Sequence, residues 1–401
     1  MLRRALVLLF GTLALTGCAT LPGPATGPGA GGAGQAVAIL LPLTGARADV
    51  AKPMLQAAEL ALVPPGSPRL IAKDTGGTPE GAAAAAQAAL AEGAKLILGP
   101  LTSGETAAVA PIARQANVAV LAFTNDPAQA QPGVWTLGIT PAQQVRRLVA
   151  AATAQGKTDF AGLLPDTGFG HALGDALLQT TGAASLPGPH IRYYSRGMTG
   201  VNAATKDIAG YASRRGSIDA KIRDARGDGT PEGRQQADEL AKSPVPPPPF
   251  NALLLGDTGE TLSEIASLLP YYDVDRNQVK ILGPALWSSA SSGAAQFSGA
   301  WYAAADPAAR VAFEQAYTAK YGTPASPLSD LAFDAASIAR VLHGNYSVAA
   351  LTQPAGFAGA DGWLALLPDG EVRRGLALFR VDRDGGQLVE PAPASAGVAG
   401  T

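Results

Sequence analysis

Short apolar runs alternate with helix-length stretches along most of the chain, and this alternation constrains the fold more than any other feature. The first expected strands and helices are, in chain order, strand 36–42, helix 49–62, strand 69–74, helix 80–92, strand 95–99, helix 103–115 and strand 118–122. Continuous apolar strands separated by helices of about 10–15 residues predict a parallel sheet covered by helices on both faces.

The same alternation then repeats. We expect helix 141–155, strand 160–164, helix 171–181, strand 191–194, strand 252–255, helix 260–269 and strand 279–282. Toward the C-terminus we expect helices at 306–321 and 329–343, followed by short antiparallel strands at 363–367, 376–381 and 388–390. For a chain of 401 residues, two α/β units explain the length better than one very large sheet.

Residues 197–250 interrupt the second unit. They combine helical stretches at 203–223 and 231–242 with four consecutive prolines at 246–249, which favour a stiff polyproline II connector. The basic residues Arg214, Arg215, Lys221, Arg223 and Arg226 gather in this segment and could steer an acidic partner surface. Alternatively, they pair with the neighbouring acids of a solvated helix.

The N-terminus has the features of a secretory signal. Arg3 and Arg4 precede an apolar run at 5–15, which is too short to remain as a membrane-spanning helix. The sequence LTGC at 15–18 resembles a bacterial lipobox, in which the chain is cut before a cysteine that receives the lipid. An ordinary signal peptide with a chance cysteine is the alternative. Residues 19–34 are rich in glycine and proline and predict a flexible spacer.

Composition excludes several classes of protein. The formal net charge is −2, and it becomes −4 once the predicted signal is removed, which argues against nucleic-acid binding. The chain has one cysteine and three histidines far apart in sequence, so we expect no intramolecular disulfide and no metal site. The S-x-x-K, G-x-S-x-G, H-E-x-x-H and P-loop motifs are all missing from the sequence, so we expect neither an enzyme nor a cofactor.

Four segments resemble the type I periplasmic-binding fold, typified by leucine/isoleucine/valine-binding proteins. They are VAILLPLTG (37–45), the stretch at 96–126, PDTGFG (165–170) and FNALLLGDTGETL (250–262). The segments at 133–149, 268–287, 313–322 and 333–342 resemble the bacterial lipoproteins called penicillin-binding protein activators. The resemblance implies two lobes, each a parallel sheet covered by helices, joined by crossovers with a ligand cleft between them.

The resemblance also implies a division of the chain. We expect a signal peptide at 1–17, a lipidated Cys18 with its spacer at 18–34 and a disordered tail at 393–401. The first lobe would comprise 35–140 and 284–355. The second would comprise 141–283 and 356–392, with 197–250 inserted.

In amino-acid receptors of this fold, a helix N-terminus and two hydroxyl groups bind the ligand carboxylate. The matching residues here are Ser103, Gly104 and Thr124, and the alternative is that Ser103 only caps its helix. The turn is shorter than in those receptors, its bulky Phe123 could fill part of the cleft, and Asp126 would bring negative charge close to the anion site.

On the opposite lobe, Phe169 matches an aromatic residue that stacks on ligands. Asp257 or Glu260 lies near the position that receives an ammonium group, although either could be a solvated acid.

Two functions remain open. One is a periplasmic lipoprotein, anchored by preference in the outer membrane, that stimulates a peptidoglycan synthase (a penicillin-binding protein). The other is a receptor that delivers a branched-chain amino acid or similar small ligand to the membrane subunits of an ABC transporter. The short turn with Phe123, the segment 197–250 and the activator-like segments favour the first.

Replacing Cys18 with alanine tests the anchor. Because Cys18 is the only thiol in the chain, we expect Cys18→Ala to release the protein from membranes or to block its processing. Membrane fractionation combined with mass spectrometry of the mature N-terminus measures both effects. Unchanged fractionation with an unmodified Cys18 would contradict the lipoprotein assignment.

Overall fold

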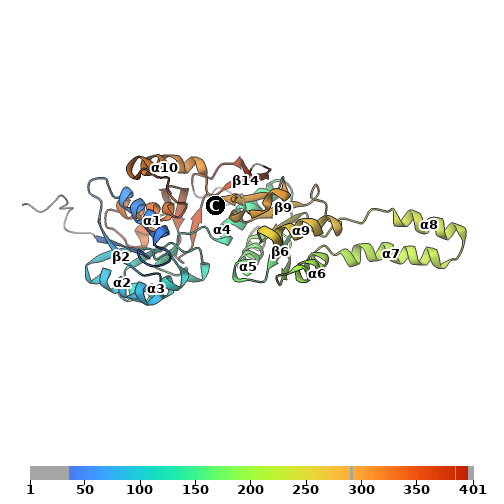
Figure 1. The fold of residues 1–401 in the computed structure, drawn as a ribbon, viewed down its shortest axis with the longest axis horizontal. Coiled ribbons are helices and arrows are strands. Elements are labelled where there is room, and N and C mark those ends of the chain that lie inside the picture. Colours follow the sequence, from blue (N-terminus) through green and yellow to red (C-terminus); the bar gives the residue numbers. More distant parts are fainter. Residues whose placement is uncertain (1–35, 290–291, 384, 396–401) are drawn as a thin grey trace, which may run out of the picture.

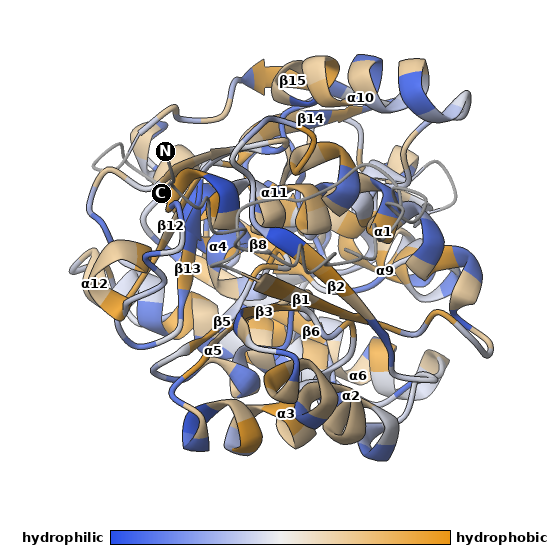
Figure 2. Ribbon diagram, turned by 90° about the vertical axis from the view of Figure 1, so that its left-hand side faces the viewer, coloured by the Kyte–Doolittle hydropathy of each residue, from blue (hydrophilic) through white to orange (hydrophobic). Residues whose placement is uncertain are grey.

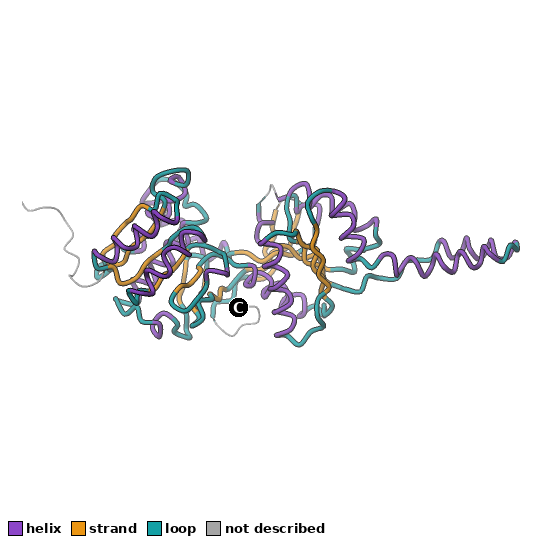
Figure 3. The backbone as a smooth tube through the Cα atoms, turned by 90° about the horizontal axis from the view of Figure 1, so that it is seen from below, coloured by secondary structure: helices purple, strands orange, loops and turns teal. Residues whose placement is uncertain are grey.

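The chain folds into two α/β lobes, and a helical hairpin projects from the second (Figures 1 and 3). The computed structural model describes residues 36–289, 292–383 and 385–395. The expected fold class, two lobes built on mainly parallel sheets covered by helices, is confirmed. The predicted signal peptide, the lipidated cysteine with its spacer, and residues 396–401 of the predicted tail lie outside the described residues.

The first lobe contains a five-stranded parallel sheet in the order β2-β1-β3-β4-β5. Its strands are β1 (Ala36–Leu41), β2 (Arg69–Asp74), β3 (Ala94–Leu98), β4 (Ala119–Ala122) and β5 (Val134–Thr136). Its helices are α1 (Ala48–Ala61), α2 (Pro79–Ala91), α3 (Ser103–Gln115), the 3-10 helix η1 (Pro127–Gln129), α10 (Pro307–Tyr321), α11 (Ser329–Val341) and α12 (Val348–Leu351).

Strand β1 shows why its sequence is continuously apolar. Val37, Ile39 and Leu41 pack with α1 and α11, whereas the alternate residues Ala38 and Leu40 pack with α2 and α3. Figure 2 looks onto this lobe and shows apolar β1 and β3 between the two pairs of helices. Because successive side chains of a strand point to opposite faces, a strand covered on both faces must be apolar at every position.

The second lobe contains a seven-stranded sheet in the order β15-β14-β10-β9-β8-β6-β7. Its strands are β6 (Phe160–Pro165), β7 (His190–Tyr194), β8 (Ala252–Leu255), β9 (Lys280–Gly283), β10 (Trp301–Ala304), β14 (Ala377–Asp382) and β15 (Gly385–Glu390). Its helices are α4 (Pro141–Ala154), α5 (Gly168–Ala183), α6 (Met198–Ile208), α7 (Tyr211–Gly227), α8 (Pro231–Ala241), α9 (Gly259–Tyr271) and the 3-10 helices η2 (Ala285–Ser288) and η4 (Ala294–Phe297). The pairings of β10 with β14 and of β14 with β15 are antiparallel, and the other pairings are parallel.

The structure divides the chain differently from the expected lobes at two places. Strand β10 pairs with β9, so 284–304 belongs to the second lobe and not to the first. The antiparallel strands β11 (Phe357–Gly359), β12 (Gly362–Leu366) and β13 (Val372–Arg374) form a separate three-stranded sheet. Phe357 and Leu364 pack into the core of the first lobe, so this sheet belongs there and not to the second lobe. The chain therefore crosses between lobes after β5, β10 and β13.

The segment 197–250 consists of two parts with different roles. Helix α6 packs Val201 and Ile208 into the core of the second lobe and is therefore integral to it. The expected helix at 203–223 is instead broken at Gly210, which has a left-handed φ of 58°. Beyond it, α7 and α8 form the projecting hairpin around a small core of Ile218, Ile222, Ala225 and Ala237 (Figure 1).

Buried Arg214 holds the foot of the hairpin. Its guanidinium donates to the carbonyl oxygens of Tyr272 (2.7 Å), Asp273 (3.2 Å) and Pro246 (2.5 Å). A Cβ placed on Gly210 would lie 3.7 Å from Cδ of Pro249, so the chain leaves and re-enters the lobe at neighbouring points. The two ends of the hairpin thus lie close together where it joins the second lobe.

Deleting the hairpin should leave the second lobe folded. We expect replacement of residues 211–248 by a short Gly/Ser linker to preserve a cooperative unfolding transition, because the hairpin has its own small core. Replacement of 197–249 should destabilise the lobe strongly, since it also removes buried Val201 and Ile208, each contributing about 1.5–3 kcal/mol. Denaturant unfolding followed by circular dichroism compares the two. Equal stability of both variants would contradict the division at Gly210.

Candidate functional site

A cavity of about 600 Å³ lies between the two lobes, beside the first and second crossovers. Its apolar wall includes Ile139, Phe169, Leu286, Leu328 and Leu331, which come from both lobes and from the first crossover. A second hollow of about 860 Å³ lies at the foot of the hairpin, between the proline run and residues 273–278. Because the first of these is bounded by both lobes, it is the position where a two-lobed protein would enclose a small ligand.

One of the residues predicted from sequence lines this cavity. Phe169, at the first turn of α5, is part of its wall. The structure also places the six other predicted residues, and none of them lines the cavity. They are Ser103, Gly104, Phe123, Thr124, Asp257 and Glu260. The clamp that they were expected to form stays a prediction.

Thr102, and not Ser103, caps helix α3. The backbone amide of Glu105 donates to Oγ1 of Thr102 (3.3 Å), and the Glu105 carboxylate accepts from the amide of Thr102 (3.0 Å). This reciprocal pair satisfies two of the amides that a helix start leaves without partners. The cap is therefore the residue before Ser103, and the capping role considered for Ser103 is wrong.

The hydroxyl of Ser103 instead donates to the carboxylate of Asp126. Asp126 also accepts from the amide of Ala128 (3.0 Å) and from Nε2 of Gln129 (3.4 Å). Burial works in the opposite direction, but the hydrogen bonds from Ser103, Ala128 and Gln129 hold the pKa of Asp126 below its usual value. The chain thus places a carboxylate of its own at the N-terminus of α3, where the helix dipole favours negative charge.

The two other residues of this turn face inward. Oγ1 of Thr124 accepts from the amide of Asp126 at 3.1 Å and so helps to shape the turn. Phe123 is 3% exposed and belongs to the core of the first lobe. Its ring lies against Gly99, where an added Cβ would come within 3.2 Å of it. Phe123 therefore fills the core and not the cleft.

The acids expected to receive an ammonium group lie elsewhere in the second lobe. Asp257 accepts from the hydroxyl of Tyr194 at 3.0 Å and from the amide of Thr258 at 2.9 Å. Burial and the neighbouring Asp257 carboxylate raise the pKa of Tyr194. Glu260 is exposed in the first turn of α9. Asp257 is thus part of an internal hydrogen-bond network.

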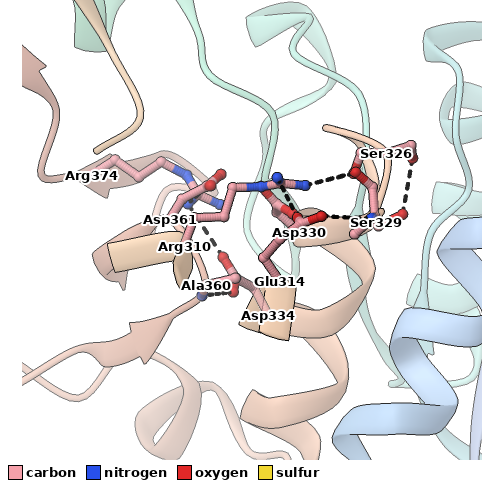
Figure 4. A network of polar contacts seen from close by, with 10 residues as sticks. Arg310, Glu314, Ser326, Ser329, Asp330, Asp334, Ala360, Asp361 and Arg374 are labelled. Atoms are coloured by element: carbon pink, nitrogen blue, oxygen red, sulfur yellow. Dashed lines mark hydrogen bonds and ion pairs between the residues drawn. The ribbon is translucent and has the colours of Figure 1, made fainter. Parts of the chain in front are cut away.

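A cluster of charged side chains that the sequence analysis did not identify forms part of the first-lobe wall of the cavity and extends behind it (Figure 4). Its members are Arg310, Glu314, Asp330, Asp334, Asp361 and Arg374. Nε of Arg310 donates to Asp330 at 2.7 Å, and Nη1 of Arg374 donates to Asp334 at 3.3 Å. The spacing of Asp330 and Asp334, four residues apart in a mostly apolar helix, is a signal that could have indicated this cluster.

The carboxyl groups of this cluster are hard to ionise. Burial raises the pKa of Asp330 to about 8, and the adjacent Asp361 carboxyl adds to this rise. Burial also raises the pKa of Asp334 to about 6, against the effect of Arg374.

Among the described residues, no group of histidine, cysteine and acidic side chains could hold a metal ion. No helix of the described part is long and apolar enough to cross a membrane.

The sequence matches the family model for periplasmic binding proteins over residues 34–385. Because this match spans most of its length, the chain belongs to the periplasmic binding protein family. Membership implies a periplasmic location, and proteins of this family are generally not catalysts. The comparison with curated proteins returns no match.

Solved structures of two kinds share the fold. A putative branched-chain amino acid ABC transporter protein from Rhodospirillum rubrum is 18% identical, with a TM-score of 0.65 over 88% of this chain and 99% of that one. The C-domain of LpoA from Haemophilus influenzae, described as a regulator of PBP1A, is 16% identical, with a TM-score of 0.60 over 88% and 100%. This chain spans 58% of full-length LpoA. Identities this low show the fold alone, and the expected type I fold is confirmed.

The contact between Ser103 and Asp126 can be tested by titration. We expect Ser103→Ala to raise the pKa of Asp126 toward its ordinary value, because the mutant lacks one hydrogen bond to the charged form. A lowered pKa contributes stability above the unfolded-state pKa that is lost as the pH falls, so the mutant should lose less stability in acid. Carbon NMR of the Asp126 carboxyl group measures the shift. Ser267→Ala on α9 is the control, and an unmoved Asp126 in Ser103→Ala would contradict the contact.

Proposed function

We propose that this chain is a non-catalytic periplasmic lipoprotein that binds and stimulates a peptidoglycan synthase. One observation carries the proposal: the carboxylate of Asp126 accepts from Ser103 at the start of α3. An amino-acid receptor needs that position for the ligand carboxylate. A second carboxylate there would be repelled by the charge of Asp126.

The projecting hairpin supports contact with a protein partner. Its helices α7 and α8 extend away from both lobes (Figure 3). The basic cluster expected to steer the partner is smaller than the sequence suggested, since Arg214 is buried and Arg215 pairs with Asp219 at 3.1 Å. We therefore attribute the contact to the reach of the hairpin and to its exposed Lys221, Arg223 and Arg226.

The proposed anchor agrees with this function. Lipidation of Cys18 would hold the protein on a membrane, by preference the outer one, and residues 19–34 would serve as the spacer. The similarity to the C-domain of an LpoA regulator is consistent with the proposal.

A second candidate function is that of a substrate-binding receptor for an ABC transporter. The interlobe cavity with Phe169 in its wall favours it, as does the similarity to receptors over nearly their whole length. Such a receptor would bind its ligand with groups other than the predicted clamp.

A synthase assay separates the two functions. We expect the mature protein to increase glycan polymerisation by a peptidoglycan synthase from the same organism, and we expect replacement of residues 211–248 to reduce this effect. Leucine, isoleucine and valine should leave the thermal midpoint unchanged. An amino acid at 100 times its dissociation constant would add roughly 2.7 kcal/mol of stability. Such a stabilisation, together with no effect on the synthase, would overturn the proposal in favour of the receptor.

A further inference from the structure

The charged cluster behind the cavity has more acids than bases. Four carboxyl groups, those of Glu314, Asp330, Asp334 and Asp361, lie near the two guanidinium groups of Arg310 and Arg374. The carboxyl groups come from α10, α11 and the turn between β11 and β12, and the two arginines come from α10 and the end of β13. Buried charges require partners of opposite sign, so the cluster as it stands lacks positive charge.

The hydrogen bonds show where positive charge is lacking. Arg310 donates to Glu314 and Asp330 and to the carbonyl oxygens of Ala325 and Ser326. Arg374 donates to Asp334 and to the carbonyl oxygen of Leu137, although its Nε has no partner. Within the described residues, Oδ1 of Asp330 and Oδ1 of Asp361 have no hydrogen-bond partner.

Asp330 and Asp361 both belong to the wall of the interlobe cavity. They are 3% and 6% exposed, so water solvates them poorly. From the second lobe, the apolar side chains of Phe169 and Leu286 line the same cavity, and Leu328 adds apolar surface beside α11. A pair of incompletely bonded acids on one wall and an apolar surface on the other match a molecule with a cationic end and an apolar body.

We propose that the interlobe cavity binds an organic cation, whose ammonium group contacts Asp330 and Asp361 and whose apolar part packs against Phe169, Leu286 and Leu328. Each acid already has one guanidinium neighbour, and an ammonium group would supply N–H donors and positive charge to the two Oδ1 atoms that have no partner. The site differs from the predicted amino-acid clamp in its residues. The inference also goes beyond the proposed function, since it holds whether or not the protein stimulates a synthase.

Without a ligand, a proton takes the place of the cation. With its pKa near 8, Asp330 is protonated at neutral pH and can share its proton with Asp361. The charged groups around it are Arg310 and Glu314 from α10, Asp334 from its own helix, Asp361 from the β11–β12 turn and Arg374 from β13. Binding of an ammonium group should therefore release about one proton. The affinity should fall about tenfold when the pH drops from 7.5 to 6.5.

Three probes of similar shape test the site. Titration calorimetry with the full mature chain would compare benzylammonium, neutral benzyl alcohol and anionic benzoate. We expect benzylammonium to bind at least tenfold more tightly than either of the others, with a proton released that is detected by using buffers of different ionisation enthalpy. Equal affinities for all three, no binding of benzylammonium, or binding without proton release would overturn the inference.

Variants locate the binding. Asp330→Asn imitates the protonated acid, so we expect it to fold, to weaken benzylammonium binding at least tenfold and to remove the proton release. Asp361→Asn should have the same effect and replaces the first variant if that one does not fold. Asp238→Asn, an exposed acid on the distant helix α8, should bind like the wild type. Unchanged affinity in a folded Asp330→Asn or Asp361→Asn protein would show that the acid pair is not the site.

Discussion

The buried guanidinium of Arg374 is the contact on which the arrangement of the two lobes depends. It lies at the end of β13, just before the third crossover, and donates to the carbonyl oxygen of Leu137 in the first crossover at 3.1 Å. It also pairs with Asp334 on α11. From the second lobe, Nε of Arg147 donates to the carbonyl of Leu376 at 2.9 Å. Removing one partner of such a buried pair typically costs about 3–5 kcal/mol. The first and third crossovers are thus held together from both lobes.

This arrangement leaves a cavity between the lobes, but the residues of the predicted clamp on the first lobe do not line it. Asp126 accepts from Ser103 at the start of α3, and Phe123 packs into the first-lobe core. The acid pair of Asp330 and Asp361 lies instead on the cavity wall, supported by Arg310. The fold is that of the periplasmic binding proteins, but the polar residues that line the interlobe cavity are not those of the predicted clamp.

The sequence predicted the fold class well, because alternating apolar runs and helices leave few alternatives to a parallel α/β sheet. It failed where short elements depend on tertiary packing. Strand β12 was expected in the second lobe together with β14 and β15, whereas β11 and β13 were not predicted. Only the packing of Phe357 and Leu364 places this small sheet in the first lobe. The site was harder to predict, since Asp330 and Asp361 belong to different elements, and only the packing of the β11–β12 turn against α11 brings them together. Ser103 was placed at the correct helix start, but its partner Asp126 depends on the shape of a turn.

The carboxylate of Asp126 accepts from Ser103 at the start of α3, where we propose that it takes the place of a ligand anion. NMR of the backbone amides of Ser103, Gly104 and Glu105 during titration with leucine tests this most directly, in the wild type and in Asp126→Ser. We predict no saturable shift of these amides in the wild type and a saturable shift in the variant, where the position is open. Saturable shifts of the same amides in the wild type would contradict the claim and restore the amino-acid clamp.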